Sequence, residues 1–405
     1  MRWTDHTILV TGASGFIGGR MCERLIQAGH RRVRAMVHDP CHAARIARLP
    51  LEIICGDLLD QRSLRHAMGD ADIVIHLGLG YGGAIVRGTR NILGLASESR
   101  AKRVVHVSTA AVYGLKPDQR AETEDAPLRK TGNIYCDNKL RAELVAQRFI
   151  RNGLPVVILR PSIVYGPYSR WCTGLVQNLQ QGRVMLIDGG EGICNTTYVD
   201  NLIDAIFLAI ENDEAIGEAL FITDGEKITW EEFIAAHQKM IGVPNVLQSI
   251  SSAEVLAYHR SRPGLLRGSL IAGREVLFSQ DFRKLMKRIP ICDRVIQELW
   301  DRLQNLTDTR KEYLRRFVSD QSGGRAASQS HSEIPDRDTL AIQTGTVYFK
   351  IDKARRLLGY SPKINFSRGI HCCEQWLRFA NCLPSLEADV ACRRTEVVAA
   401  LQADS

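Results

Sequence analysis

The first 160 residues alternate short, almost wholly apolar runs with amphipathic stretches of helical periodicity. Strands that are buried on both faces are such continuous apolar runs, whereas strands with one wet face alternate. The order therefore predicts an α/β fold, a Rossmann-type doubly wound parallel sheet with helices on both faces. The expected strands are Ile8–Val10, Val33–Val37, Leu51–Cys55, Ile73–Leu77, Val104–Val107 and Val156–Leu159.

Composition narrows the classes of protein that such a chain can represent. A length of 405 residues with 45% apolar content allows a large core. Eleven cysteines include no Cys-x-x-Cys pair and no zinc-type spacing, so we expect reduced thiols, no metal and a cytoplasmic location. We find no apolar run of about 18 residues and expect no membrane span. The net charge of +8 comes without a nucleic-acid motif, so we expect no nucleic-acid partner.

We expect two domains, one of them discontinuous. Residues 1–165, with 196–228 returning to them, form the dinucleotide-binding Rossmann domain, and residues 166–195 and 229–405 form a smaller α/β substrate-binding domain. The latter contains an unusual insertion at 248–346, with a Gly- and Ser-rich loop near 319–345 that we expect to be disordered. Residues 262–318 mix apolar and basic stretches. They suit either a solvated basic helix or a weak contact with an anionic membrane surface.

A glycine-rich turn, TGASGFIG at residues 11–18, follows the first expected strand and opens the first expected helix. Gly12 permits a tight turn, Gly15 lets backbone N–H groups approach a pyrophosphate, and Gly18 allows close helix–strand packing. The helix N-terminus adds oriented N–H donors. The pattern predicts a dinucleotide-binding turn, with contacts from Gly12, Ser14, Gly15, Phe16, Ile17 and Gly18.

The turn and its spacing resemble the extended branch of the short-chain dehydrogenase/reductase superfamily, the NAD-dependent epimerase/dehydratase family. Further segments resemble that branch in the same order; these are 56–60, 76–78, 88–93, 160–167, 198–201 and 352–362. The resemblance covers about residues 7–235 and 347–380. It implies a nicotinamide coenzyme, with Asp57 on the adenine amino group and Leu58 beside the ring. It also assigns coenzyme contacts to Leu77, Gly78, Pro161 and Val164.

The end of the second strand bears on the choice between NAD and NADP. An acidic residue there binds the ribose hydroxyls of NAD, whereas a basic residue accepts the 2′-phosphate of NADP. Val37 stands where similar NAD-dependent proteins carry the acid, followed by His38 and Asp39. We favour NADP, with His38 as a contact and NAD bound through Asp39 as the alternative, because of a basic cluster at Arg31, Arg32, Arg34 and Arg45.

Tyr135 and Lys139 are four residues apart on an expected helix, so their side chains share a face. A nearby ammonium favours the phenolate, which otherwise forms only near pH 10. Tyr135 is therefore the expected acid/base, with Lys139 lowering its pKa and binding the coenzyme ribose. By resemblance, the catalytic Ser/Thr at the end of the fifth strand is Thr109, with Ser108 in support, and both position the substrate oxygen.

Ala110 and Ala111 follow Thr109 where similar sugar 4,6-dehydratases carry an acid, so elimination of water is disfavoured. We favour an NAD(P)-dependent oxidoreductase that acts as a nucleotide-sugar epimerase or reductase. The segment 79–84 is short for such an epimerase, and the alternative is a dehydrogenase or reductase of a steroid-like or other hydrophobic alcohol. A non-catalytic, coenzyme-sensing protein is the third interpretation. The partner in each is a small molecule, and the substrate and assembly state, a homodimer included, stay open.

Overall fold

A computed structural model of the chain describes residues 5–80, 82–242, 247–261 and 334–383. The chain divides into two compact units, Met1–Ser252 with Ile334–Ser405, and Ala253–Glu333. Of the second unit only residues 253–261 are described, within helix α8 (Ser252–Ser261). The expected membrane contact of 262–318 lies outside the described residues. Among the helices that are described, none is long and apolar enough to cross a membrane.

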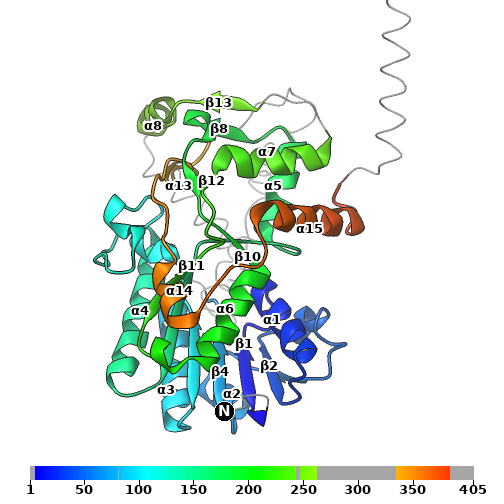
Figure 1. Cartoon of the computed structure of the whole chain (residues 1–405), viewed down its shortest axis with the longest axis vertical. Coiled ribbons are helices and arrows are strands. Elements are labelled where there is room, and N and C mark those ends of the chain that lie inside the picture. Colours follow the sequence, from blue (N-terminus) through cyan, green and yellow to red (C-terminus); the bar gives the residue numbers. More distant parts are fainter. Residues whose placement is uncertain (1–4, 81, 243–246, 262–333, 384–405) are drawn as a thin grey trace, which may run out of the picture. The chain divides into compact units, whose positions relative to one another are not determined.

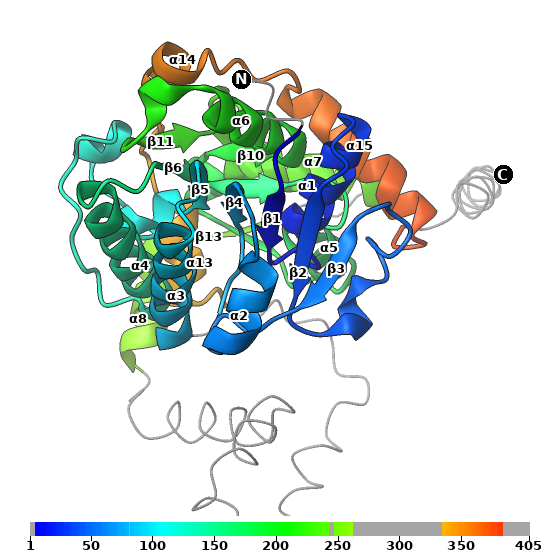
Figure 2. The same ribbon diagram turned by 90° about the horizontal axis from the view of Figure 1, so that it is seen from below.

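Seven strands form the central sheet of the first unit (Figure 1). Their order is β11-β6-β5-β4-β1-β2-β3, which can be followed in Figure 2. Every neighbouring pair in it is parallel. The order reverses between β1 and β4, which is the switch point where ligands of open α/β sheets bind, at the carboxyl ends of the strands. The doubly wound prediction is confirmed. The strands are β1 (Ile8–Thr11), β2 (Val33–Val37), β3 (Glu52–Cys55), β4 (Ile73–His76), β5 (Arg103–Val107), β6 (Val156–Pro161) and β11 (Ala219–Ile222).

Helices cover both faces of this sheet (Figure 2). Because side chains alternate along a strand, β1 sends Ile8 and Val10 into one core cluster and Leu9 into the other. The first cluster includes Met21 from α1 (Phe16–Gln27) and Leu202 from α6 (Val199–Glu211). The second receives side chains from α2 (Gln61–Met68), α3 (Gly83–Glu98) and α4 (Ile134–Arg151).

A third core cluster lies beyond the carboxyl ends of the strands. Tyr165, Phe233 and Cys373 are fully buried in it. Three helices contribute to it, α5 (Arg170–Gln180), α7 (Trp230–Ile241) and α15 (Phe366–Phe379). Three two-stranded pairs accompany them; these are β7 (Ile163–Tyr165) with β10 (Thr196–Tyr198), β9 (Ile193–Cys194) with β12 (Ile228–Thr229), and β8 (Met185–Ile187) with β13 (Gln248–Ile250). Helix α14 (Asp352–Leu358) packs near β11.

The prediction of a disordered loop reaching residue 345 is wrong at its C-terminal end. Helix α13 (Arg337–Gln343) is capped by Asp336, whose carboxylate accepts the N–H of Thr339 at 2.7 Å. The Gln343 side chain accepts the N–H of Ile187 at 3.0 Å, which attaches the helix to β8. The Gly- and Ser-rich composition that prompted the prediction ends before this helix, and residues 319–333 lie outside the described part.

Candidate active site

The glycine turn between β1 and α1 leaves no room for a Cβ atom at Gly12 or Gly18. Gly12 has φ +69°, and a Cβ added there would lie 2.9 Å from the Leu77 oxygen. A Cβ on Gly18 would lie 2.1 Å from the Gly12 oxygen. Gly15 caps α1 without a side chain and is exposed, so the first N–H groups of the helix stay available to a phosphate. The turn therefore fits a dinucleotide.

The carboxyl ends of the neighbouring strands meet at this turn. Thr11 Oγ1 accepts the N–H of Gly78 at 3.0 Å and lies 2.8 Å from Nδ1 of His76, which ties β1 to β4. A Cβ on Gly78 would lie 2.9 Å from the Leu58 side chain, so Leu58 also borders the turn. The structure brings together the predicted coenzyme residues Gly12, Leu58, Leu77 and Gly78.

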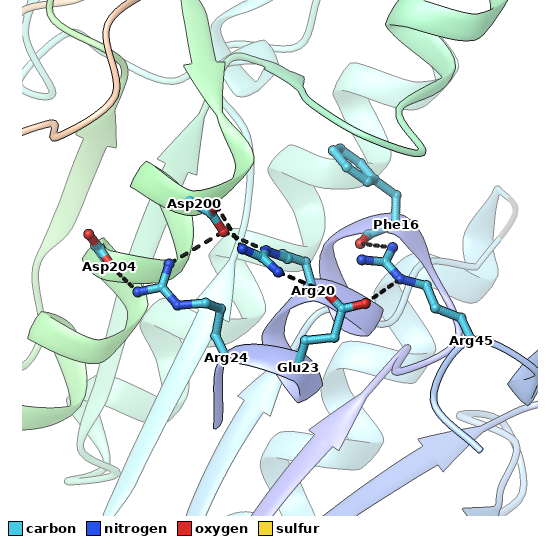
Figure 3. A network of polar contacts seen from close by, with 7 residues as sticks. All are labelled: Phe16, Arg20, Glu23, Arg24, Arg45, Asp200 and Asp204. Carbon is cyan, nitrogen blue, oxygen red and sulfur yellow. Dashed lines mark hydrogen bonds and ion pairs between the residues drawn. The ribbon is translucent and has the colours of Figure 1, made fainter. Parts of the chain in front are cut away.

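Ion pairs hold the opening of α1 from two sides (Figure 3). Arg20 binds Asp200 of α6 through two hydrogen bonds, of 2.6 and 2.9 Å. Arg45 donates to the Phe16 carbonyl at 3.3 Å and to Glu23 at 2.8 Å. Because Phe16 is the first residue of α1, these contacts fix the segment that would receive the diphosphate.

The other predicted coenzyme contacts lie along the same edge of the sheet. The carboxylate of Asp57 accepts the N–H of Leu59 at 2.9 Å, and its second oxygen lies 3.7 Å from Nε2 of the exposed His38. Pro161 ends β6, and Val164 follows in β7.

The four arginines expected to favour NADP do not form one group. Arg31 and Arg32 precede β2 and Arg34 is its second residue, so all three lie at the amino end of the strand, away from the glycine turn. Arg34 is engaged there by Glu52 and Asp70, at 2.9 and 2.7 Å. Of the cluster, Arg45 alone contacts α1, and the prediction of a basic cluster beside the ribose is wrong.

Lys139 lies beneath the end of β5. It is buried on α4, and its Nζ donates to the carbonyl oxygen of Val107 at 3.3 Å. Burial lowers its pKa to about 8, and the charge of Glu143, one turn further along α4, opposes that shift.

Tyr135 lies in the first turn of α4, which Asn133 caps by accepting the N–H of Cys136. Desolvation raises the pKa of Tyr135, and the neighbouring Thr109 side chain opposes the rise. Desolvation of the phenolate therefore acts against the lowering of this pKa that the sequence predicts. A phenol with a raised pKa is protonated at neutral pH.

The structure does not bring the Ser108 hydroxyl to Tyr135. Ser108 Oγ donates instead to Glu143 at 2.7 Å, in a fully buried ion pair of Glu143 with Arg160. Sequence reasoning missed Glu143 as part of the site. A signal was present, because Glu143 lies four residues after Lys139 on a helical face that packs against the sheet, where an unpaired carboxylate is rare.

Comparison with known proteins agrees with this geometry. The model of the NAD dependent epimerase/dehydratase family matches residues 8–222. A 2-alkyl-3-oxoalkanoate reductase of Stenotrophomonas maltophilia is 30% identical over 268 residues, which cover 60% of this chain and 78% of that protein. A 4-hydroxy-2-methyl-3-oxo-4-farnesyl-3,4-dihydroquinoline-1-oxide ketoreductase of Stigmatella aurantiaca is 27% identical over 297 residues, or 67% of this chain and 88% of the relative.

Among solved structures, the UDP-glucose 4-epimerase of Thermotoga maritima with UDP-glucose has the same fold, with a TM-score of 0.64 at 16% identity. The superposition covers 92% of this chain and 99% of that one. The matched family segment spans the glycine turn, the strand ends and α4. The chain therefore belongs to the NAD dependent epimerase/dehydratase family.

Proposed function

We propose that this protein is an NAD(P)-dependent ketoreductase, which reduces a carbonyl group of a hydrophobic small molecule to an alcohol. The observation that carries the proposal is the position of Lys139, whose Nζ donates to the Val107 carbonyl oxygen at the end of β5. This places the amine two residues before Thr109 on the strand side and one helical turn after Tyr135 on α4. The site lies at the carboxyl edge of the sheet, on which the glycine turn also opens. The ketone-reducing relatives support the same reaction.

When bound, the coenzyme supplies the hydride. Thr109 then holds the carbonyl oxygen of the substrate, and the Tyr135 phenol donates its proton to that oxygen, which becomes the alcohol hydroxyl. A raised pKa suits this direction, because it keeps Tyr135 protonated and ready to donate. The ammonium of Lys139 stabilises the phenolate that remains.

Elimination of water needs a further acid or base that this strand end does not offer. Ala110 and Ala111 follow Thr109 and begin a short 3-10 helix, η3 (Ala110–Tyr113). Neither side chain can transfer a proton. Their presence supports simple reduction over dehydration.

Apolar side chains beside the site support a hydrophobic substrate. Leu79 follows Gly78 and is 62% exposed, and Ile134 precedes Tyr135 and is 75% exposed. Both residues are sequence neighbours of residues assigned to the site, and apolar surface that gathers at such a site can bind an apolar ligand. We therefore propose a hydrophobic ketone as the substrate, in preference to the nucleotide sugar that the sequence motifs favour.

We propose NADP as the coenzyme. The proposal now depends on the residues at the carboxyl end of β2 and on Arg45, and no longer on the arginines at the amino end of that strand. Val37 ends β2 without a carboxylate, and the Asp39 carboxylate accepts the N–H of Cys41 at 2.9 Å to cap a local turn. His38 is exposed at the same strand end, and Arg45 lies beside Phe16. This arrangement suits a 2′-phosphate better than two free ribose hydroxyls.

The test is a substrate panel of 3-oxoalkanoates, other hydrophobic ketones and nucleotide sugars. Each is incubated with NADPH or NADH and followed by nicotinamide absorbance and by chromatography of the products. We expect stoichiometric coenzyme oxidation with a hydrophobic ketone. Epimerised sugar without a net absorbance change would replace the proposal with an epimerase. Coenzyme binding with no turnover across the panel would favour a sensor.

A further inference from the structure

A fully buried polar network lies behind the proposed catalytic residues. It connects the end of β5 with α4 and β6 through Ser108, Glu143 and Arg160. Ser108 Oγ donates to Glu143 Oε2 at 2.7 Å, and Arg160 Nε lies 3.1 and 3.2 Å from the two carboxylate oxygens. Arg160 also donates to the Tyr113 hydroxyl at 2.6 Å. The exposed fractions of Ser108, Glu143 and Arg160 are 4%, 0% and 2%.

A buried ion pair of this kind contributes little net stability to a fold. Removing two charges from water costs several kcal/mol per ion, and apolar side chains of similar volume often stabilise a core as well. Each carboxylate oxygen of Glu143 is nevertheless hydrogen-bonded. A fully satisfied buried network fixes one geometry for the elements that it joins.

The elements joined here are the ones that carry the site. Ser108 directly precedes Thr109, and Glu143 lies two helical turns after Tyr135 on α4. The end of β5 is attached to α4 at two successive residues, by the Val107 carbonyl to Lys139 and by the Ser108 hydroxyl to Glu143. The next residue along the chain is Thr109, the neighbour whose side chain acts to lower the pKa of Tyr135.

We propose that Glu143 is a positioning residue: its carboxylate, held by Arg160, fixes Ser108 and thereby places the Thr109 hydroxyl against Tyr135. This inference rests on the proposed function, since Thr109 and Tyr135 are the proposed reacting groups. Glu143 acts through Ser108 and touches no reactant.

Glu143 also sets the charge environment of Lys139. Besides Tyr135 on the same helix, the titratable groups whose charges interact with that of Lys139 are Glu143 on α4, His76 on β4 and His106 on β5. Burial lowers the pKa of both histidines, so they are neutral at pH 7. The carboxylate of Glu143 is therefore the anionic group among them, and it favours the protonated amine.

The decisive variant is Ser108→Ala, which removes the hydroxyl without disturbing the ion pair. We expect a folded protein with unchanged coenzyme affinity and a kcat lower by about tenfold to a hundredfold, since misplaced reacting groups cost that much. Ser108→Thr retains a hydroxyl and should recover most of the loss. Glu143→Gln retains an acceptor but not the charge, and should also move the alkaline limit of the pH–rate profile to lower pH.

Two further variants, Ile203→Val and Tyr135→Phe, distinguish a failure of the positioning role from a failure of the proposed function. Ile203→Val truncates a buried core residue of α6 and should leave kcat unchanged, which controls for small losses of stability. Wild-type kcat in Ser108→Ala, with Tyr135→Phe inactive, would overturn the positioning role and leave the ketoreductase intact. Full activity of Tyr135→Phe would instead remove the proposed function, and the positioning role with it. If Glu143→Gln does not fold, the kcat of Ser108→Ala alone tests the positioning role.

Discussion

Lys139 donates a hydrogen bond from Nζ to the carbonyl oxygen of Val107, at 3.3 Å. This contact holds the amine beneath the end of β5, two residues before Thr109. The helix that carries the proposed acid, Tyr135, and the strand that leads to Thr109 are therefore joined through the amine itself. The charge on Lys139 then has a structural as well as an electrostatic effect on the site.

The rate of ketone reduction should decline as the pH rises through about 8. Burial lowers the pKa of Lys139 to about 8, so above that pH the amine loses its charge. In the proposed reaction this charge stabilises the Tyr135 phenolate. A pH profile of kcat/KM for the ketone measures this limit. Lys139→Arg, whose side chain stays charged, should move the limit upward in whatever activity remains. A flat profile from pH 6 to roughly 10 would contradict the assignment.

The lowered pKa of Lys139 affects stability in the opposite direction: activity should fall with rising pH, whereas the contribution of Lys139 to the free energy of unfolding should rise. The unfolded chain holds the Lys139 proton up to its ordinary pKa of 10.5, whereas the folded chain releases it at about 8. The unfolded state binds more protons in this interval, so the contribution of Lys139 to the free energy of unfolding rises with pH. Comparison of the wild type with Lys139→Met in urea unfolding at pH 7 and pH 9.5 isolates the effect. A larger penalty from Lys139 at pH 9.5 than at pH 7 would refute it.

Gly18→Ala should damage the coenzyme turn. The added Cβ would lie 2.1 Å from the Gly12 oxygen, so the turn must shift. We expect a loss of about 1–3 kcal/mol in the free energy of unfolding, as for other overpacked sites, together with weaker coenzyme binding. Denaturant unfolding and fluorescence titration with NADPH measure the two effects.

Gly94→Ala is the matched control for Gly18→Ala. Gly94 lies inside α3, and a Cβ there would meet the Phe149 ring at an ordinary 3.9 Å. Alanine in place of a helical glycine should stabilise the protein by about 0.5–1 kcal/mol and leave coenzyme affinity unchanged. Equal effects of the two substitutions would show that the turn has no special role.

His38→Asp should shift the coenzyme preference from NADPH toward NADH. A carboxylate at the end of β2 repels a 2′-phosphate and accepts hydrogen bonds from ribose hydroxyls. The measurement is the ratio of kcat/KM for the two coenzymes. Arg31→Ala, at the amino end of the same strand, should leave that ratio unchanged. An effect of Arg31→Ala as large as that of His38→Asp would contradict the placement of the coenzyme.

Much of the architecture could be read from the sequence because strands buried on both faces must be apolar throughout. The six strands expected in the first 160 residues are present, with ends shifted by at most one or two residues, and the glycine turn lies between the expected strand and helix. Helix α13 was missed because its short sequence follows a polar stretch and depends on tertiary contacts, among them that of Gln343 with Ile187.

Two parts of the site needed three-dimensional information. The arginines at 31, 32 and 34 are close to Val37 in sequence, but a strand separates its two ends by its whole length, so adjacency in sequence misplaced them. Ser108 and Thr109 both carry hydroxyls, yet successive residues of an extended chain point in opposite directions. The Ser108 hydroxyl accordingly donates to Glu143, whereas Thr109 is the neighbour whose side chain acts to lower the pKa of Tyr135.

The most direct measurement compares wild type and Tyr135→Phe in coenzyme binding and in NADPH oxidation with a hydrophobic ketone that the wild type reduces. The variant lacks the proton to be donated and keeps the ring. It should bind NADPH with unchanged affinity and lose about 10²–10⁴-fold in kcat. Turnover equal to that of the wild type would show that another group supplies the proton, and would contradict the assignment of Tyr135 as the acid.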